Sequence, residues 1–152
     1  MRSSLLTVLL IALATCALTA CEPIGPVPGA DLSGQVSDVP DDWSQTADVD
    51  VFQLETSPTD PYSVNIWGVA IDDDFYIAAG DNGDTRWAAS LMEDAKVRLR
   101  VGEAIYEMTA ELVADPNEKT AARAAYIAKY ELDPETVPVD QFALYRLDPR
   151  GP

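Results

Sequence analysis

The chain has 152 residues, 26 of them acidic and 10 basic, and a formal net charge of −16. This charge argues against a nucleic-acid partner, because neutralising phosphates requires clustered lysine and arginine side chains. Hydrophobic residues make up 47% of the sequence, which is ordinary for one globular domain and too high for a disordered acidic chain. Because histidine is absent from the sequence, Ser-His-Asp and Cys-His catalysis and all histidine metal sites are excluded.

The N-terminus is typical of an export signal. Arg2 precedes an apolar run from residue 5 to residue 18, which has about the length of a secretory signal core and is short for a membrane span. The run ends in Leu18-Thr19-Ala20-Cys21, which resembles the bacterial lipobox. The resemblance implies cleavage before Cys21 and lipidation of its thiol. The alternatives are an ordinary signal peptide cut nearby or an uncleaved anchor.

Lipidation would place the protein at the cell envelope, facing the periplasm or the exterior, with the membrane as a partner. Each buried CH₂ of an acyl chain contributes about 0.8 kcal/mol, so several chains anchor a protein firmly. An acidic domain is repelled by anionic headgroups, so the lipid must provide the attachment. No free thiol would then remain for redox or nucleophilic chemistry, since cleavage also removes Cys16.

Residues 22–38 contain three prolines and three glycines and show little periodicity, which is typical of a linker. We therefore divide the chain into a signal peptide at 1–20, a flexible linker at 21–38 and one domain at 39–152. Residues 39–43 suggest a short helical turn, and we expect Trp43 to pack on the domain as a lid.

Three strands are predicted before the first helix, at residues 48–55, 62–71 and 75–79. The second and third form a hairpin through the polar turn Asp72-Asp73-Asp74. A loop at residues 80–85 leads into a helix at 86–94, which Asp84 or Thr85 can cap. Trp87 and Leu91 lie four residues apart and therefore share one face of this helix.

The clearest predicted element is a hairpin at residues 96–112, in which apolar and charged residues alternate on both sides of Gly102-Glu103. A two-residue turn gives three cross-strand pairs: Arg98 with Glu107, Leu99 with Tyr106, and Val97 with Met108. A shift of one residue would turn both faces inside out, so the pattern selects a single register.

A second helix is expected from Asp115-Pro116 to about Tyr130, since aspartate at the N-cap and proline at the first helical position are favourable. Ala122, Tyr126 and Tyr130 form a stripe at helical spacing. Residues 142–147 form a closing strand. The fold class is therefore mainly β with two helices (α+β), and an antiparallel barrel with helices at its ends fits this order because closure removes exposed strand edges.

This order of elements resembles the split β-barrel of the pyridoxamine-phosphate-oxidase-like superfamily, and more narrowly its deazaflavin-dependent nitroreductase-like members and their short uncharacterised relatives. The similarity extends from about Val49 to Tyr130. It is carried by many small signals: Ile66-Trp67, Val69, residues 74–77, Gly83, residues 87–91, residues 97–102, Tyr106, Ala125-Tyr126 and Lys129-Tyr130.

The resemblance implies a cleft between barrel and helices that binds FMN or the deazaflavin F420, commonly at a homodimer interface. The cofactor would meet the second strand and the loop after the third. The candidate cofactor-binding residues are Ser63, Asn65, Thr85, Arg86 and Trp87. Tyr62 and Trp67 could line the same cleft. For Trp87 the alternative is a helix packing its indole into the barrel, and for the strand residues it is ordinary alternation.

The loop departs from the family pattern, because Asp81 and Asp84 stand where phosphate donors are expected and Arg86 is the one cation. The leading hypothesis is therefore a non-catalytic or degenerate binding module with a small-molecule ligand. The alternatives are an FMN- or F420-dependent oxidoreductase acting on a small organic acceptor, and a structural scaffold of the envelope. The acidic turns at 72–74 and 81–84 offer oxygen ligands for calcium, but the second lacks the ligand spacing and the terminal glutamate of an EF-hand loop. We interpret both as solvated turns and assign no metal site.

Overall fold

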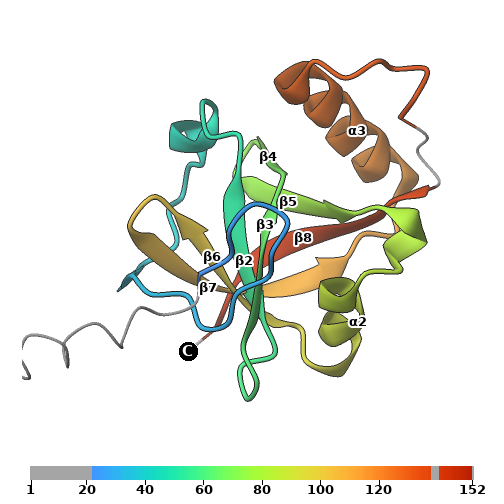
Figure 1. Ribbon diagram of the computed structural model, residues 1–152. Coiled ribbons are helices and arrows are strands. Elements are labelled where there is room, and N and C mark those ends of the chain that lie inside the picture. The colour runs from blue at the N-terminus through green and yellow to red at the C-terminus, as the bar shows by residue number, and fades with distance from the viewer. Residues whose placement is uncertain (1–21, 138–140, 152) are drawn as a thin grey trace, which may run out of the picture.

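The computed structural model describes residues 22–137 and 141–151 (Figure 1). The predicted signal peptide and Cys21 lie outside these residues. The strands are β1 (Gln35–Ser37), β2 (Phe52–Thr56), β3 (Tyr62–Ile66), β4 (Gly68–Ile71), β5 (Asp74–Ala79), β6 (Lys96–Val101), β7 (Ala104–Leu112) and β8 (Ala143–Pro149). The helices are the short 3-10 turns η1 (Ser44–Thr46) and η2 (Asp81–Gly83) and the α-helices α2 (Arg86–Glu93) and α3 (Pro116–Tyr130).

The strands form one eight-stranded sheet in the order β3-β2-β6-β7-β8-β5-β4, with β1 added beside β7. All pairs are antiparallel except β1 with β7. The two outer strands of this order, β3 and β4, are joined in the chain by Trp67 alone. The sheet must therefore curl until its two edges meet at this residue. We call this unpaired line between β3 and β4 the seam. The predicted barrel with two helices is confirmed.

The prediction of one continuous strand at residues 62–71 is wrong, because the chain changes partner at Trp67. Residues before it pair with β2, and residues after it pair with β5. Gly68 makes the close passage possible, since a Cβ there would lie 2.6 Å from the ring of Phe75. The predicted hairpin is confirmed for β4 and β5, with Ile71 opposite Asp74.

The strand predicted at residues 48–55 begins later, at Phe52. Its partner β3 ends at Ile66, which lies opposite Phe52, so residues 48–51 have no strand to pair with. Val51 consequently lies outside the strand and is exposed. The apparent alternation of Val49 and Val51 with aspartates was therefore a misleading signal.

The hairpin of β6 and β7 has the predicted register, with Arg98 opposite Glu107, Leu99 opposite Tyr106 and Val97 opposite Met108. The apolar face lies inside the barrel, where Val97, Leu99 and Met108 are fully buried. The charged face differs from the expectation in one respect: Arg98 forms its ion pairs with Glu55 and Asp31, while Glu107 pairs with Arg150.

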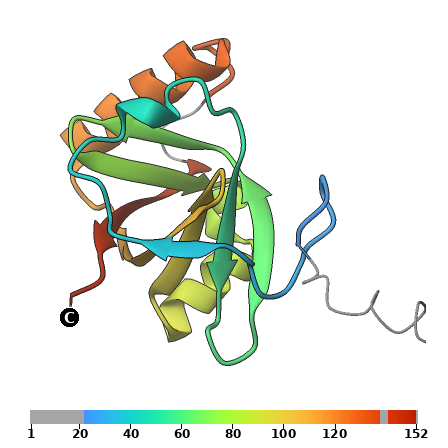
Figure 2. The same cartoon turned by 90° about the vertical axis from the view of Figure 1, so that its left-hand side faces the viewer.

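Two apolar clusters hold the helices against the barrel. The main cluster fills the barrel interior and includes Trp43, Phe52, Phe75 and, from α2, Trp87 and Leu91. A second cluster lies between α3 and the strands β4, β5 and β8; its buried members include Ala122, Tyr126 and Leu144. Figure 2 shows α3 lying across β4 and β5, and α2 at the opposite end of the barrel. Trp43 packs on the domain as predicted, and it is buried in the main cluster with its ring 5.0 Å from that of Phe75.

Side-chain caps begin both α-helices where the sequence predicted them. Thr85 accepts a hydrogen bond from the Ala88 N–H at 3.3 Å. Asp115 accepts hydrogen bonds from the N–H groups of Asn117 and Glu118, at 2.7 and 3.2 Å. Each cap satisfies donors that the first helical turn leaves without partners. In the described part of the chain, no helix is long and apolar enough to cross a membrane.

Residues 22–37 pack on the barrel instead of standing apart as a flexible linker. Leu32 is buried, and its N–H donates to Oε2 of Glu55 at 2.6 Å. Gly29 exchanges two backbone hydrogen bonds with Ser63, and β1 pairs with β7. Proline and glycine content misled the prediction because extended segments of this composition can add to a sheet edge or cover its outer face as readily as they can form a linker.

Candidate functional site

A groove lies at the seam beside Trp67, between β3, β5 and α2. Its volume is about 580 Å³, within the range of roughly 300–1,000 Å³ that is usual for small-molecule sites. We call it the seam groove. It is lined by Gly25, Val51, Asn65, Ile66, Trp67, Ala78, Gly80, Trp87 and Phe142.

Trp67 stands at the centre of the groove because it joins the two edges of the sheet. Its indole stacks on the ring of Tyr130, with centroids 4.6 Å apart and planes inclined by 11°. The hydroxyl of Tyr130 accepts from the Gly68 N–H at 3.0 Å and lies 2.9 Å from the Gly68 carbonyl. Tyr130 of α3 thus covers one face of the Trp67 indole and holds it in place, although Trp67 is 49% exposed.

Trp87 forms the wall contributed by α2. The Thr85 cap sets the start of this helix, and Trp87 then points toward the barrel, where its ring lies 5.8 Å from that of Tyr145. Its side chain is nearly buried, as expected for a helix that packs its indole into the barrel. Trp87 therefore packs in the main apolar cluster, and the exposed edge of its ring lines the groove.

Among the described residues that line the seam groove, Asn65 supplies the one amide and none carries a charged side chain. The amide nitrogen of Asn65 donates to the carbonyl oxygens of Gly25 and Pro23, at 3.0 and 3.4 Å. The turn at residues 24–27 is thereby held beside the groove, and Ile24 and Val27 close the turn with two backbone hydrogen bonds.

Of the five candidate cofactor-binding residues, the structure brings Asn65 and Trp87 to the seam groove. Ser63 is buried beneath Gly29 in the backbone pairing described above, and Thr85 caps α2. The guanidinium of Arg86 lies 4.1 Å from the centre of the Tyr62 ring. Neither Arg86 nor Tyr62 is among the groove-lining residues.

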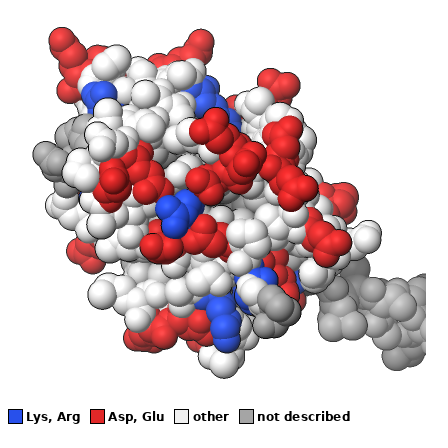
Figure 3. Space-filling model, turned by 180° about the vertical axis from the view of Figure 1, so that it is seen from behind, with Lys and Arg blue, Asp and Glu red and all other residues white. Residues whose placement is uncertain are grey.

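The chemistry of this donor set does not fit a phosphate. A phosphate dianion requires positive or hydrogen-bond-donating groups, whereas none of the groove residues that the structure describes is a lysine or an arginine. The nearby loop adds the exposed carboxylates of Asp81 and Asp84. Figure 3 shows that acidic side chains also cover much of the face opposite to that seen in Figure 1. The arrangement suits a flat, uncharged, largely apolar ligand held between aromatic rings.

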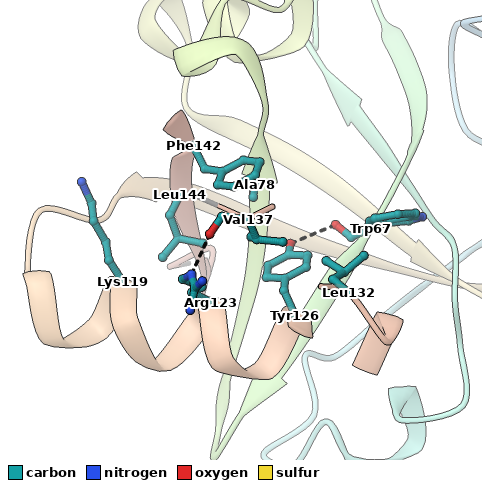
Figure 4. A pocket seen from close by; sticks show the side chains of 9 residues that line it. All are labelled: Trp67, Ala78, Lys119, Arg123, Tyr126, Leu132, Val137, Phe142 and Leu144. Carbon is teal, nitrogen blue, oxygen red and sulfur yellow. Dashed lines mark hydrogen bonds between the residues drawn. The ribbon is translucent and has the colours of Figure 1, made fainter. Parts of the chain in front are cut away.

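A smaller apolar pocket lies on the other side of Trp67, between α3 and the strands β5 and β8 (Figure 4). It shares Trp67, Ala78 and Phe142 with the seam groove, but its volume is about 120 Å³, below the usual range for ligand sites. In Figure 4 the Arg123 side chain turns to the Val137 carbonyl, to which its Nε donates at 2.7 Å. The guanidinium of Arg123 is thus hydrogen-bonded to a backbone carbonyl.

The titratable groups of α3 near the seam act as hydrogen-bond donors. Burial raises the pKa of Tyr126, whose hydroxyl lies 3.2 Å from the carbonyl oxygen of Trp67, and burial likewise raises the pKa of Tyr130. Burial lowers the pKa of Lys129, whose Nζ donates to the carbonyl oxygens of Thr46 and Gly68 at 3.1 and 3.0 Å. The tyrosines remain protonated at neutral pH, which favours a structural role.

Sequence reasoning missed several groove residues, notably Gly25, Val51, Ala78 and Phe142. Val51 was assigned to a strand and Gly25 to a linker, so neither was expected near Asn65. Phe142 was recognised only as the start of the closing strand. No local signal marks these residues, because they meet through pairing between distant segments.

The acidic turns were also considered as cation sites. In residues 22–137 and 141–151, no group of three or more histidine, cysteine, aspartate or glutamate side chains is placed to hold a metal ion. Asp72 adopts a positive φ of 53° in the turn between β4 and β5, and its side chain is exposed. This turn connects the two strands of the β4–β5 hairpin.

Solved structures share this fold at low sequence identity. A candidate pyridoxamine 5'-phosphate oxidase from Listeria innocua matches 67% of this chain and 85% of its own, at 15% identity and a TM-score of 0.53. A conserved hypothetical protein from Mycobacterium tuberculosis matches 79% and 87%, at 18% identity and a TM-score of 0.57. The heme storage protein HutZ from Vibrio cholerae matches 69% and 84%, at 16% identity and a TM-score of 0.52.

These similarities establish the split β-barrel fold of the pyridoxamine-phosphate-oxidase-like type. No protein with curated functional information matches the chain. A family model described as "Uncharacterized protein conserved in bacteria (DUF2255)" matches residues 41–140, well over half of the sequence. The chain therefore belongs to this family.

Proposed function

We propose that the protein is an envelope lipoprotein whose split-barrel domain binds a flat, largely apolar small molecule that carries no phosphate. The observation that carries the proposal is the composition of the seam groove, in which Trp67, Trp87 and Phe142 supply aromatic surface and Asn65 supplies the amide. Aromatic faces favour planar ligands, and one polar group is enough to orient such a ligand.

The anchor rests on the sequence Leu18-Thr19-Ala20-Cys21, with residues 1–20 as a signal peptide. We expect Cys21 to be the lipidated N-terminus. In cells, Cys21→Ala should move the protein from the membrane fraction to the soluble fraction. Retention of this variant in the membrane fraction would contradict lipidation as the means of attachment.

The main alternative is an FMN- or F420-dependent oxidoreductase. It is supported by the shared fold with the Listeria innocua structure and opposed by the groove lining, whose described residues include no lysine or arginine. A heme site finds less support, because the part of the groove lining that the structure describes offers no histidine, cysteine, methionine or tyrosine to bind the iron. A scaffold without a ligand is the third possibility.

Riboflavin and FMN distinguish these functions, because they share one ring system and differ by a phosphate. The chain from Cys21 onward, made as Cys21→Ser, contains every described residue and would be titrated with each compound while ligand fluorescence is followed. We expect riboflavin to bind at least as tightly as FMN. Phe142→Ala should weaken both about tenfold, since it removes one aromatic wall.

Arg86→Ala is the matched control, because its guanidinium stacks on Tyr62 outside the groove. It should leave the binding of both compounds unchanged. Binding of FMN alone, lost on Arg86→Ala, would support the oxidoreductase and contradict our proposal. Binding of neither riboflavin nor FMN would favour the scaffold.

A further inference from the structure

Exposed apolar side chains occur in the lining of the seam groove and in the turn beside it. Val51 and Trp67 line the groove, and Gly25 lies in the turn that presents Ile24 and Val27. Ile24 is 77% exposed, Val27 62%, Val51 51% and Trp67 49%. We call these four residues the apolar rim. Exposed apolar residues that gather beside a groove mark an interaction surface, whereas single ones are common.

The chain enters the described structure at this rim. Ser33 donates a hydrogen bond to the carboxylate of Glu22, which also forms an ion pair with Arg100 of β6; these contacts lower the pKa of Glu22. Glu22 also lines a shallow depression together with Val51 and Asn65. The segment after Cys21 is therefore attached to the barrel beside the rim and cannot hold the domain away from its anchor.

The distribution of charged residues also distinguishes the N-terminal turn from the opposite face of the domain. Residues 23–30 contain no charged side chain. Figure 2 shows these residues as part of a blue loop that stands out beside the barrel, on the side facing the viewer in Figure 1. Acidic side chains spread over the opposite face (Figure 3). Anionic headgroups repel that face, whereas the turn at residues 23–30 adds no charge. Exposed carboxylates also flank the groove residues Val51 and Gly80 in the chain, at Asp50, Asp81 and Asp84.

We propose that the apolar rim rests on the lipid surface of the membrane, so that the seam groove opens toward the bilayer. This inference rests on the attachment proposed above and holds equally for an uncleaved N-terminal anchor, because residues 5–18 are apolar in either case. The ligand would then enter from the lipid phase, which agrees with the apolar lining of the groove.

Trp67 provides the readout. The other two tryptophans, Trp43 and Trp87, are 1% and 8% exposed, so quenching at the surface reports on Trp67. The chain from Cys21 onward has one cysteine, which can be coupled to a maleimide lipid in phosphatidylcholine vesicles. Brominated acyl chains should lower the Trp67 emission by about twofold relative to unbrominated vesicles, and a Trp67→Phe variant identifies this component.

Ile24→Ser combined with Val27→Ser should abolish most of this quenching, because the turn loses its apolar contact with lipid. Val36→Ser combined with Met92→Ser is the matched control; both residues are exposed, at 56% and 87%, and lie outside the rim. The control should leave the quenching unchanged. Absence of quenching in the coupled parent chain, or equal quenching in the rim variant, would overturn the proposal.

Two further outcomes are distinguishable. A dimer in solution that Ile24→Ser with Val27→Ser dissociates would assign the rim to a second copy of the chain and overturn the lipid contact. Failure of native lipidation would appear only in the Cys21→Ala fractionation, because chemical coupling supplies the anchor in the vesicle experiment.

Discussion

Glu55 and Arg98 lie opposite each other in β2 and β6 and form an ion pair, with Oε2 of Glu55 3.0 Å from Nη1 of Arg98. The same guanidinium nitrogen lies 3.0 Å from Oδ1 of Asp31, and the Glu55 carboxylate accepts the Leu32 N–H. The ion pair therefore joins the N-terminal segment to the outer face of the barrel.

Glu55→Gln should destabilise the protein by about 2 kcal/mol, because it leaves a half-buried Arg98 with one remaining acidic partner and weakens the Leu32 hydrogen bond. The free energy of unfolding in urea measures the loss. Glu93→Gln, at an exposed position of α2, is the control and should change little. Equal stability of the two variants would show that the buried carboxylate contributes nothing specific.

Leu32→Ala tests whether the N-terminal segment belongs to the folded domain. Leu32 is 1% exposed, so the truncation should cost about 2–5 kcal/mol through lost burial and the cavity that remains. Val36→Ala, in the same segment but exposed, should cost less than about 0.5 kcal/mol. A flexible linker would instead give similar urea midpoints for both variants.

Gly68→Ala tests the close passage of the chain after Trp67. The new methyl group would lie 2.6 and 2.7 Å from two carbons of the Phe75 ring, which must shift within a packed core. We expect a loss of about 1–3 kcal/mol in thermal or urea unfolding. Gly80→Ala provides the comparison, because a Cβ there meets nothing within 4 Å. A neutral Gly68→Ala would mean that the seam is more loosely packed than described.

Alkaline pH should destabilise the fold. Burial raises the pKa of Tyr76, Tyr126, Tyr130 and Tyr145 above the ordinary value of 10.0. Above pH 10 the folded chain therefore retains tyrosine protons that the unfolded chain releases. The contribution of these tyrosines to the free energy of unfolding is complete below pH 10 and is lost as the pH rises through their pKa values in the folded chain. Lys129 acts in the opposite direction: burial lowers its pKa, so below pH 10.5 the unfolded chain keeps a proton that the folded chain releases. Above pH 10.5 the contribution of Lys129 no longer changes with pH.

Urea midpoints between pH 8 and pH 11, combined with tyrosinate absorbance, measure this dependence. Each tyrosine that ionises only on unfolding contributes a slope of about 1.4 kcal/mol per pH unit above pH 10. Tyr126→Phe removes one such group and should reduce the slope by about that amount. A midpoint that does not change with pH would contradict the assigned burial of these hydroxyls.

The sequence determined the local elements of this protein. The hairpin of β6 and β7 has the register that its alternation of charged and apolar residues selects, and Asp115 begins α3 as its capping chemistry predicts. Both features depend on residues close together in the chain, so their signals are complete within a short window. The Trp87–Leu91 face of α2 follows from helical spacing in the same way.

Tertiary structure alone decided the seam, the packing of residues 22–37 and the seam groove. Nothing within residues 62–71 indicates that pairing changes at Trp67, because the change depends on β2 and β5 lying on different sides of the barrel. Likewise, Asn65 reaches the carbonyls of Pro23 and Gly25 across about 40 residues. Such contacts form only when the sheet curls and brings its two edges together. Short stretches of the sequence contain no signal for this closure, because the residues that meet are far apart in the chain.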